Sequence, residues 1–106
     1  MITHTQGIYN FYVYILTNKH KTVLYTGVTN NLKVRLQQHK TKYNPKSFTA
    51  KYNVHYLLHY EHFGWIQKAI EREKEIKNLT RIKKEKLIEA QNPKWEFLNH
   101  LFEPSF

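Results

Sequence analysis

Two aromatic and β-branched segments near the start of the chain constrain its fold more than any other feature of the sequence. Residues 11–16 (FYVYIL) and 22–29 (TVLYTGVT) both have the composition of β-strands. Only five polar residues, 17–21, separate the two segments. So short a polar connection predicts an antiparallel hairpin over residues 11–29.

The remainder of the chain alternates between helical and strand patterns. A helix is predicted to begin after Asn30, a suitable N-cap, and to fade near residues 43–45. Residues 54–60 are predicted to form a third strand, and helices are predicted over residues 65–78 and 80–91. The order ββαβαα predicts an α+β fold in which helices flank a three-stranded, mostly antiparallel sheet.

Length and composition limit the class of protein. At 106 residues the chain has room for one domain, predicted to span residues 1–106. The absence of cysteine excludes disulfides, thiolate zinc sites and cysteine nucleophiles. No apolar run approaches the roughly 20 residues of a membrane helix, and the first residues lack the pattern of a signal peptide. We therefore expect a cytoplasmic protein that does not enter a membrane.

Positive charge is concentrated in the first part of the chain. The sequence has 17 Lys and Arg against eight acidic residues, and residues 1–60 contain eight basic side chains and no acid. This asymmetry favours a cationic surface that faces a polyanion, with counterion release contributing to affinity. The alternative is a basic protein whose charge serves only its solubility.

Acidic side chains are just as unevenly distributed. All eight are glutamates, and the first is Glu61. Two-metal nuclease sites usually need several carboxylates from separate elements, and glycosidases need a carboxylate pair, so neither kind of site suits this chain. The sequence also lacks a Gly-rich phosphate loop. Any carboxylate that binds a metal must therefore come from the C-terminal half.

Glu73 occupies an unusual position on the helix predicted over residues 65–78. On a helical wheel it falls at the centre of the apolar stripe formed by Ile66, Ala69, Ile70 and Ile76. An unpaired buried carboxylate costs several kcal/mol, so Glu73 must be paired, protonated or bound to a cation. Two interpretations stay open: a salt bridge to an Arg or Lys at the edge of the core, and a metal ligand at the edge of the sheet.

The first predicted helix carries two basic side chains, opposite in charge to Glu73, at the edge of its apolar stripe. Arg35 and His39 are four residues apart, so their side chains lie on one helical face, at the edge of the apolar stripe. An arginine fork beside a histidine suits a phosphodiester, although a surface Arg and a partly buried His would give the same pattern. Tyr14 and Tyr25 lie on the two hairpin strands, where tyrosines more often serve packing than chemistry.

Taken together, these residues resemble the GIY-YIG nuclease family, specifically its small single-domain, UPF0213-like group. In that family a first-motif Tyr precedes the second-motif Tyr by about eleven residues, and an Arg follows ten residues later and a His four after that. A Glu lies on a later helix, and an Asn comes near the end. The matching residues, in chain order, are Tyr14, Tyr25, Arg35, His39, Glu73 and Asn92. The resemblance covers about residues 11–98 and implies a single GIY-YIG-like domain.

The literal triplet Gly7-Ile8-Tyr9 is not taken as the first motif. Tyr9 lies sixteen residues before Tyr25, too far for the hairpin that the family uses. The motif residue is therefore Tyr14, with Tyr12 in place of the family's Gly and Thr26 in place of Ile. Gly27 is retained, and a glycine there allows close approach of another group to the backbone.

The resemblance also implies a reaction: hydrolysis of a DNA phosphodiester with one divalent metal. Glu73 would hold Mg²⁺ or Mn²⁺, Tyr14 would act on the attacking water, and Arg35 would neutralise the phosphate. Tyr25 would bind the phosphate or the water, a nearby cation (Arg35, His39 or the metal) would help the weakly basic Tyr14, and Asn92 would brace the site. Contacts to the nucleic-acid backbone are expected from four lysines: Lys33, Lys40, Lys51 and Lys77.

Two alternatives to the nuclease remain open. The chain could be a non-catalytic DNA- or RNA-binding module, or an interaction protein that uses its 16 aromatic residues at a partner surface. Zinc binding by His55, His59 and His62 is disfavoured, because positions 55 and 59 of one strand lie about 13 Å apart. Other GIY-YIG members take their targeting from extra domains, so we expect weak intrinsic specificity or a protein partner that supplies it. No pattern sets the oligomeric state.

Overall fold

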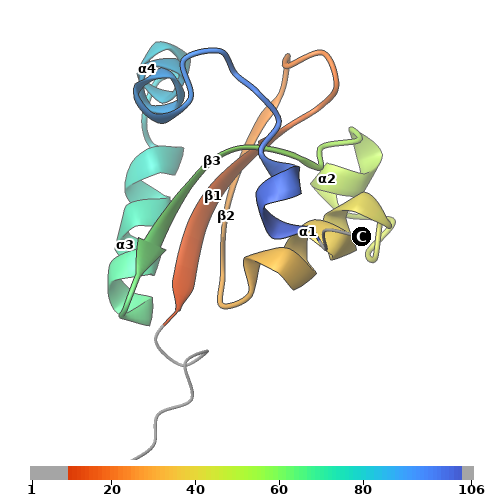
Figure 1. Cartoon of the computed structure of the whole chain (residues 1–106), viewed down its shortest axis with the longest axis horizontal. Coiled ribbons are helices and arrows are strands. Elements are labelled where there is room, and N and C mark those ends of the chain that lie inside the picture. The colour runs from red at the N-terminus through yellow and green to blue at the C-terminus, as the bar shows by residue number, and fades with distance from the viewer. Residues whose placement is uncertain (1–9, 104–106) are drawn as a thin grey trace, which may run out of the picture.

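A three-stranded antiparallel sheet lies at the centre of the structure, a computed structural model that describes residues 10–103 (Figure 1). Its strands are β1 (Phe11–Thr17), β2 (Leu24–Thr29) and β3 (Tyr56–Phe63), in the spatial order β2-β1-β3. Both neighbours pair antiparallel with β1, so the predicted hairpin and the predicted sheet are confirmed. The literal triplet Gly7-Ile8-Tyr9 lies outside the described residues.

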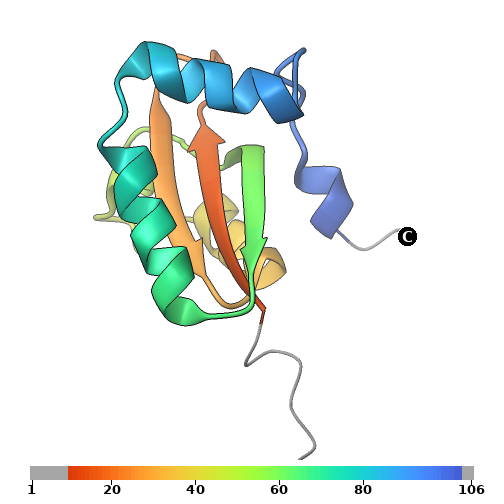
Figure 2. The same cartoon turned by 90° about the vertical axis from the view of Figure 1, so that its left-hand side faces the viewer.

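Helices cover both faces of this sheet. They are α1 (Leu32–Lys40), α2 (Phe48–Lys51), α3 (Ile66–Lys77), α4 (Arg81–Gln91) and the 3-10 helix η2 (Asn99–Phe102). α1, α2 and η2 lie on one side of the sheet and α3 on the other (Figure 1). Figure 2 shows α3 running alongside the strands and α4 crossing one end of the sheet. Within residues 10–103, no helix has the length and apolar character needed to cross a membrane.

The observed order agrees with ββαβαα except for two short helices, α2 and η2, which the sequence did not predict. Several boundaries also differ. β2 begins at Leu24 rather than at residue 22, and α1 ends at Lys40 rather than near residues 43–45. The third strand begins at Tyr56 and runs to Phe63, because it pairs along the whole of β1. The N-cap of α1 is Asn31 rather than Asn30: its side-chain oxygen accepts a hydrogen bond from the Val34 amide at 3.1 Å.

The alternation of β1 divides the core in two. Val13 and Ile15 face α3 and α4, where they pack with Ala69, Ile76 and Ile88. On the other face of the strand, Tyr14 and Leu16 pack with residues of α1 and β3. All of these side chains are buried. Tyr14 is therefore held rigidly by the central strand, on the face that α1 covers.

Candidate active site

Tyr14 is the centre of the candidate site. In the hairpin it lies directly opposite Gly27, and its ring extends over this glycine. A Cβ atom at position 27 would come within 2.5 Å of the Tyr14 hydroxyl oxygen. Only glycine therefore lets the ring pass over β2, the edge strand, and carry its hydroxyl towards α1.

A chain of hydrogen bonds leads from Tyr14 to α2. Tyr14 Oη lies 3.0 Å from His39 Nε2, and His39 Nδ1 lies 2.8 Å from Thr49 Oγ1. His39 is in the last turn of α1, and Thr49 is buried in α2, next to the N-cap Ser47 at 3.3 Å. This Tyr–His–Thr chain engages both ring nitrogens of His39 and so fixes the orientation of the imidazole.

Burial determines the protonation of both rings. Burial and the neighbouring Tyr25 raise the pKa of Tyr14, although the Arg35 guanidinium acts in the opposite direction. Burial, together with the charges of Arg35 and His55, lowers the pKa of His39 to about 4. At neutral pH Tyr14 is therefore a neutral phenol and His39 a neutral imidazole, so the phenol can donate its proton to Nε2.

Arg35 and Tyr25 line a pocket of about 250 Å³ beside this chain. Arg35 lies one turn before His39 on α1, and no carboxylate within residues 10–103 pairs with it. Tyr25 packs against His39 with 5.8 Å between ring centroids. Lys42 adds a second cation, and none of the described lining residues is acidic. The pocket therefore suits a phosphate group.

Glu73 belongs to α3, on the other side of the sheet (Figure 1). Its side chain is 16% exposed, and Oε2 lies 3.3 Å from Lys77 Nζ, one turn later on the helix. The carboxylate adds to the effect of burial in raising the pKa of Tyr14, so the two groups interact electrostatically. Of the two interpretations left open by the sequence, the salt bridge is present, with a half-exposed lysine as the partner.

A single carboxylate limits how a metal can be held. Within residues 10–103, no three His, Cys, Asp or Glu side chains gather around a possible ion position, and His55, His59 and His62 do not form such a group. Mg²⁺ usually keeps several waters and is bound by one or two carboxylates together with substrate phosphates. Glu73 fits an ion shared with a phosphate in this way, and does not fit an ion held by protein ligands alone.

Asn92, predicted to brace the site, is used elsewhere in the fold. It is the buried C-cap of α4, and its side chain donates to Leu58 O at 3.0 Å and to Glu96 O at 2.8 Å. Its side-chain oxygen accepts from the Glu96 amide at 3.0 Å. These bonds tie the end of α4 to β3, and none of them reaches Tyr14 or His39. The structure therefore does not bring Asn92 into the Tyr–His–Thr group.

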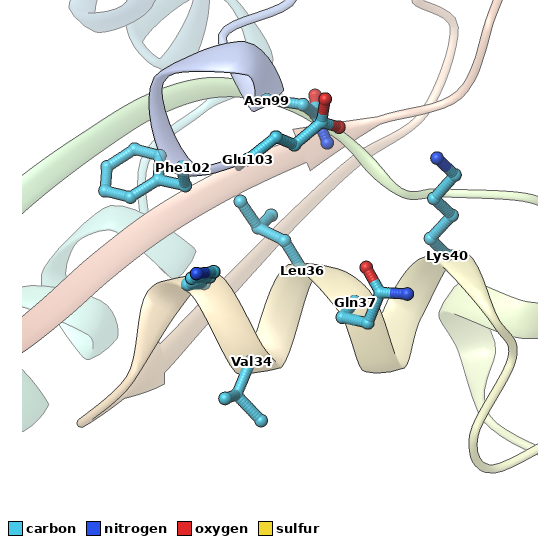
Figure 3. A pocket seen from close by; sticks show the side chains of 8 residues that line it. Val34, Leu36, Gln37, Lys40, Asn99, Phe102 and Glu103 are labelled. Carbon is cyan, nitrogen blue, oxygen red and sulfur yellow. The ribbon is translucent and has the colours of Figure 1, made fainter. Parts of the chain in front are cut away.

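The predicted phosphate-binding lysines of α1 face away from the Tyr–His–Thr chain. Lys33 and Lys40 line a second pocket, of about 340 Å³, between α1 and η2. Leu36 points from α1 into this pocket, towards Phe102 (Figure 3). None of the described residues lines both pockets, so the two lie on different sides of α1. Lys33 and Lys40 are poorly placed for a phosphate bound at Arg35.

The other cations show what the sequence analysis missed. Lys77 is paired with Glu73, whereas Lys51 lies over the Tyr52 ring, 5.6 Å from its centroid. Lys42 lines the first pocket but was not predicted, and neither was the contact of Thr49 with His39. A four-residue helix has too few turns to show a hydrophobic period. The only local signal for α2 is its serine N-cap, at position 47.

A second polar cluster, which we call the Arg72 cluster, joins β3 to α3. His59 Nε2 lies 2.7 Å from Glu61 Oε2, and Arg72 binds both carboxylate oxygens of Glu61 at 2.8 and 3.1 Å. Arg72 also pairs with Glu75. Burial alone would raise the pKa of Glu61, but hydrogen bonds from His59 and Arg72 lower it to about 2. This cluster is internally neutralised and has a structural role.

The sequence is similar to a known family model and to two known proteins. A family model described as the GIY-YIG catalytic domain matches residues 10–86. A UPF0213 protein from Natronomonas pharaonis is 40% identical over 77 residues, 73% of this chain and 88% of that protein. One from Oceanobacillus iheyensis is 42% identical over 80 residues, 76% of this chain and 91% of that protein.

A solved structure gives the same result. The solution NMR structure of a UPF0213 protein from Bacillus halodurans matches with a TM-score of 0.53 and 31% sequence identity. The match covers 86% of this chain and 93% of that one. These similarities confirm the resemblance identified from the spacing of the motif residues.

Proposed function

The chain belongs to the GIY-YIG family, and from this membership and the geometry of its site we propose that it is a metal-dependent endonuclease acting on DNA. GIY-YIG proteins are generally nucleases. The observation that supports the proposal most directly is the Tyr–His–Thr chain, which ends beside an arginine that no carboxylate in the described residues neutralises. Such a site is poorly explained by stability alone.

Arg35 and Tyr25 would bind the phosphate. A guanidinium offers five donors in a planar fork that matches two phosphate oxygens, and it keeps its charge at any relevant pH. Because no carboxylate of the described residues competes for Arg35, its charge is available to stabilise the additional negative charge that develops during hydrolysis. Tyr25, on the wall of the same pocket, would donate a hydrogen bond to the phosphate or orient the water.

Tyr14 and His39 would handle the proton of the attacking water. A phenol whose pKa is raised by burial is a poor base on its own, so Tyr14 needs an acceptor for its own proton. His39 Nε2, 3.0 Å away, is that acceptor. As the Tyr14 oxygen takes a proton from water, its own proton passes to His39, and Thr49 holds the ring in place. A bound phosphate would offset the positive charge that forms on the imidazole.

Glu73 is the residue that would hold Mg²⁺ or Mn²⁺. For Glu73 to bind a divalent ion in place of Lys77, only a partly exposed i,i+4 ion pair has to break, and such a pair contributes little to the stability of the protein. When bound, the ion would stabilise the charge on the leaving 3′ oxygen. Because Glu73 is a lone carboxylate, we expect the ion to bind tightly only together with DNA.

The second candidate function is a DNA- or RNA-binding module without catalysis. The Glu73–Lys77 pair favours it, since a carboxylate already paired in the protein has no need of a metal. The Tyr–His–Thr chain favours the nuclease, because binding alone does not require a buried phenol aligned with a neutral imidazole. Target selection by a separate protein partner is compatible with either function.

Cleavage assays with Glu73→Gln distinguish the two functions. Labelled single-stranded, duplex, flap and branched DNA would be incubated with Mg²⁺ or Mn²⁺ and either the wild type or the variant. We expect the wild type to cut and Glu73→Gln to lose at least a hundred-fold in rate, with DNA affinity retained.

Glu71→Gln is the matched control, because Glu71 lies one half-turn earlier on α3 and is 70% exposed. It should cut at the wild-type rate. Binding without cleavage by the wild type in either metal would refute the nuclease and favour the binding module. Equal cutting by Glu73→Gln would refute the metal assignment.

A further inference from the structure

α2 presents two aromatic rings to solvent beside the pocket of the candidate site. Phe48 is 47% exposed and Tyr52 is 46% exposed, with 4.8 Å between their ring centroids. We call these two rings the aromatic platform. Phe48 also stacks on Tyr25, with 6.1 Å between centroids and 21° between ring planes. The platform is therefore continuous with the pocket in which a phosphate would bind.

Packing of the core does not explain these exposed rings. Neither Phe48 nor Tyr52 belongs to the two described core clusters or to the residues packed against them. Tyr43, in the loop before α2, is 75% exposed and lines the same pocket as Phe48. Several large rings gathered on one exposed surface are typical of a binding site.

Positive charge surrounds the platform. Lys51 Nζ lies 5.6 Å from the centre of the Tyr52 ring, and Lys42 lines the adjoining pocket. Lys46 lies in the same segment, and the chain has no acidic residue before Glu61. Aromatic rings bordered by lysines are the combination with which proteins bind single-stranded nucleic acid: bases stack on the rings and the cations follow the backbone. A neutral or basic protein partner would gain nothing from these charges.

The exposed faces of the two rings indicate whether single-stranded or duplex nucleic acid can bind to them. In a continuous duplex the base faces are covered by their neighbours, and only base edges are accessible in the grooves. A flat ring can therefore stack only on a base that has left the helical stack. Because Phe48 contacts Tyr25 of the pocket wall, such a base would belong to a nucleotide next to the bound phosphate.

We propose that Phe48 and Tyr52 stack against unpaired bases next to the scissile phosphate, and that the substrate is single-stranded or splayed DNA rather than continuous duplex. This inference rests on the proposed function for the position of the phosphate. In this proposal α2 and the loop before it select the substrate, while side chains of β1 and α1 carry out the catalysis.

Binding measured without cleavage tests the platform separately from catalysis. A short oligonucleotide containing 2-aminopurine would be titrated in EDTA, as a single strand and as a duplex, with binding followed by fluorescence anisotropy. We expect the wild type to bind the single strand at least ten-fold more tightly than the duplex and to quench the 2-aminopurine by stacking. Each stacked base contributes roughly five- to one-hundred-fold in affinity.

The test variant is Phe48→Leu combined with Tyr52→Leu, which keeps apolar volume and removes both rings. It should lose about ten-fold or more in single-strand affinity and most of the quenching, while duplex affinity changes less than two-fold. Ile82→Ala is the control: Ile82 is 66% exposed on α4, and its loss should change neither affinity.

Two results would overturn the proposal: equal affinity of the wild type for single strand and duplex, or unchanged quenching by the double variant. Failure to bind any nucleic acid would also overturn it and would point to a protein partner for the exposed rings. Failure of the proposed nuclease function would give a different result. The protein would then not cut DNA with Mg²⁺, but the binding measured in EDTA would still test the platform. Cutting without a single-strand preference would refute the platform alone.

Discussion

Arg35 and Arg72 are both helical arginines beside the sheet, but their surroundings are opposite. Arg72 on α3 binds Glu61 and also pairs with Glu75, so its charge is neutralised within the protein. Arg35 on α1 lies in the half of the sequence that lacks acids, and no carboxylate in the described residues pairs with it. The difference separates an arginine that stabilises the fold from one that is available to a ligand.

Replacing Arg35 with Gln should give the largest effect and should fall on catalysis. We expect the cleavage rate to drop by about 10²- to 10³-fold, because the guanidinium would no longer stabilise the developing phosphate charge. The free energy of unfolding should be unchanged or slightly raised, since no carboxylate within residues 10–103 pairs with the cation that is removed. Cleavage kinetics and urea denaturation of the same preparation measure both. A large loss of stability would show that Arg35 has a structural role like that of Arg72.

The same replacement at Arg72 should act on stability. Arg72→Gln leaves Glu61 partly buried without its cation, so we expect the free energy of unfolding to fall by about 2–3 kcal/mol. The cleavage rate per folded molecule should stay within about three-fold of wild type, because Arg72 is bound to Glu61 and Glu75, neither of which has a part in the proposed reaction. Urea titration at pH 7 measures the first effect. If the rate falls as far as in Arg35→Gln, the distinction between the two arginines is wrong.

The smallest expected effect is a pH dependence from His39. Its pKa in the folded protein is about 4, below the 6.5 of an unperturbed histidine, so the unfolded chain binds a proton first as the pH falls. This residue should therefore cost the fold about 1–2 kcal/mol between pH 7 and pH 5, and the loss should level off only once the pH is below the folded pKa of about 4. In His39→Gln the loss over the same range should be smaller by that amount. Identical pH profiles for the two proteins would mean that His39 is not buried as described.

Much of the fold could be predicted because it depends on local patterns. The hairpin, the long helices and the antiparallel sheet follow from strand composition, helical period and a short polar turn. The boundaries of β3 could not be predicted, since pairing with β1 decides where the strand ends. α2 was missed because one helical turn has no period, and its formation depends on the cap at Ser47 and on the contact of Thr49 with His39.

The candidate site divides in a similar way. The spacing of motif residues selected Tyr14, Tyr25, Arg35 and His39. In the structure the last three line one pocket, and Tyr14 lies behind it in contact with His39 and Tyr25. The contacts between them depend on tertiary packing and could not be derived from intervals. The same limit applies to Asn92, which suits a brace by its position in the sequence, although the bonds that it makes hold α4 to β3.

The turn of the hairpin has a consequence for chemistry that takes place some distance away. Asn18 holds this turn by hydrogen bonds with Thr22 at 2.8 Å and with the Val23 amide at 3.3 Å. The turn sets which residue of β2 faces Tyr14, and only at Gly27 is there space for the ring. Insertion or deletion of a single residue between the strands would therefore change the pairing by a whole step and place Thr26 or Val28 beneath the ring. The length of a solvent-exposed turn is thus as much a determinant of the reactive geometry as any side chain in the pocket.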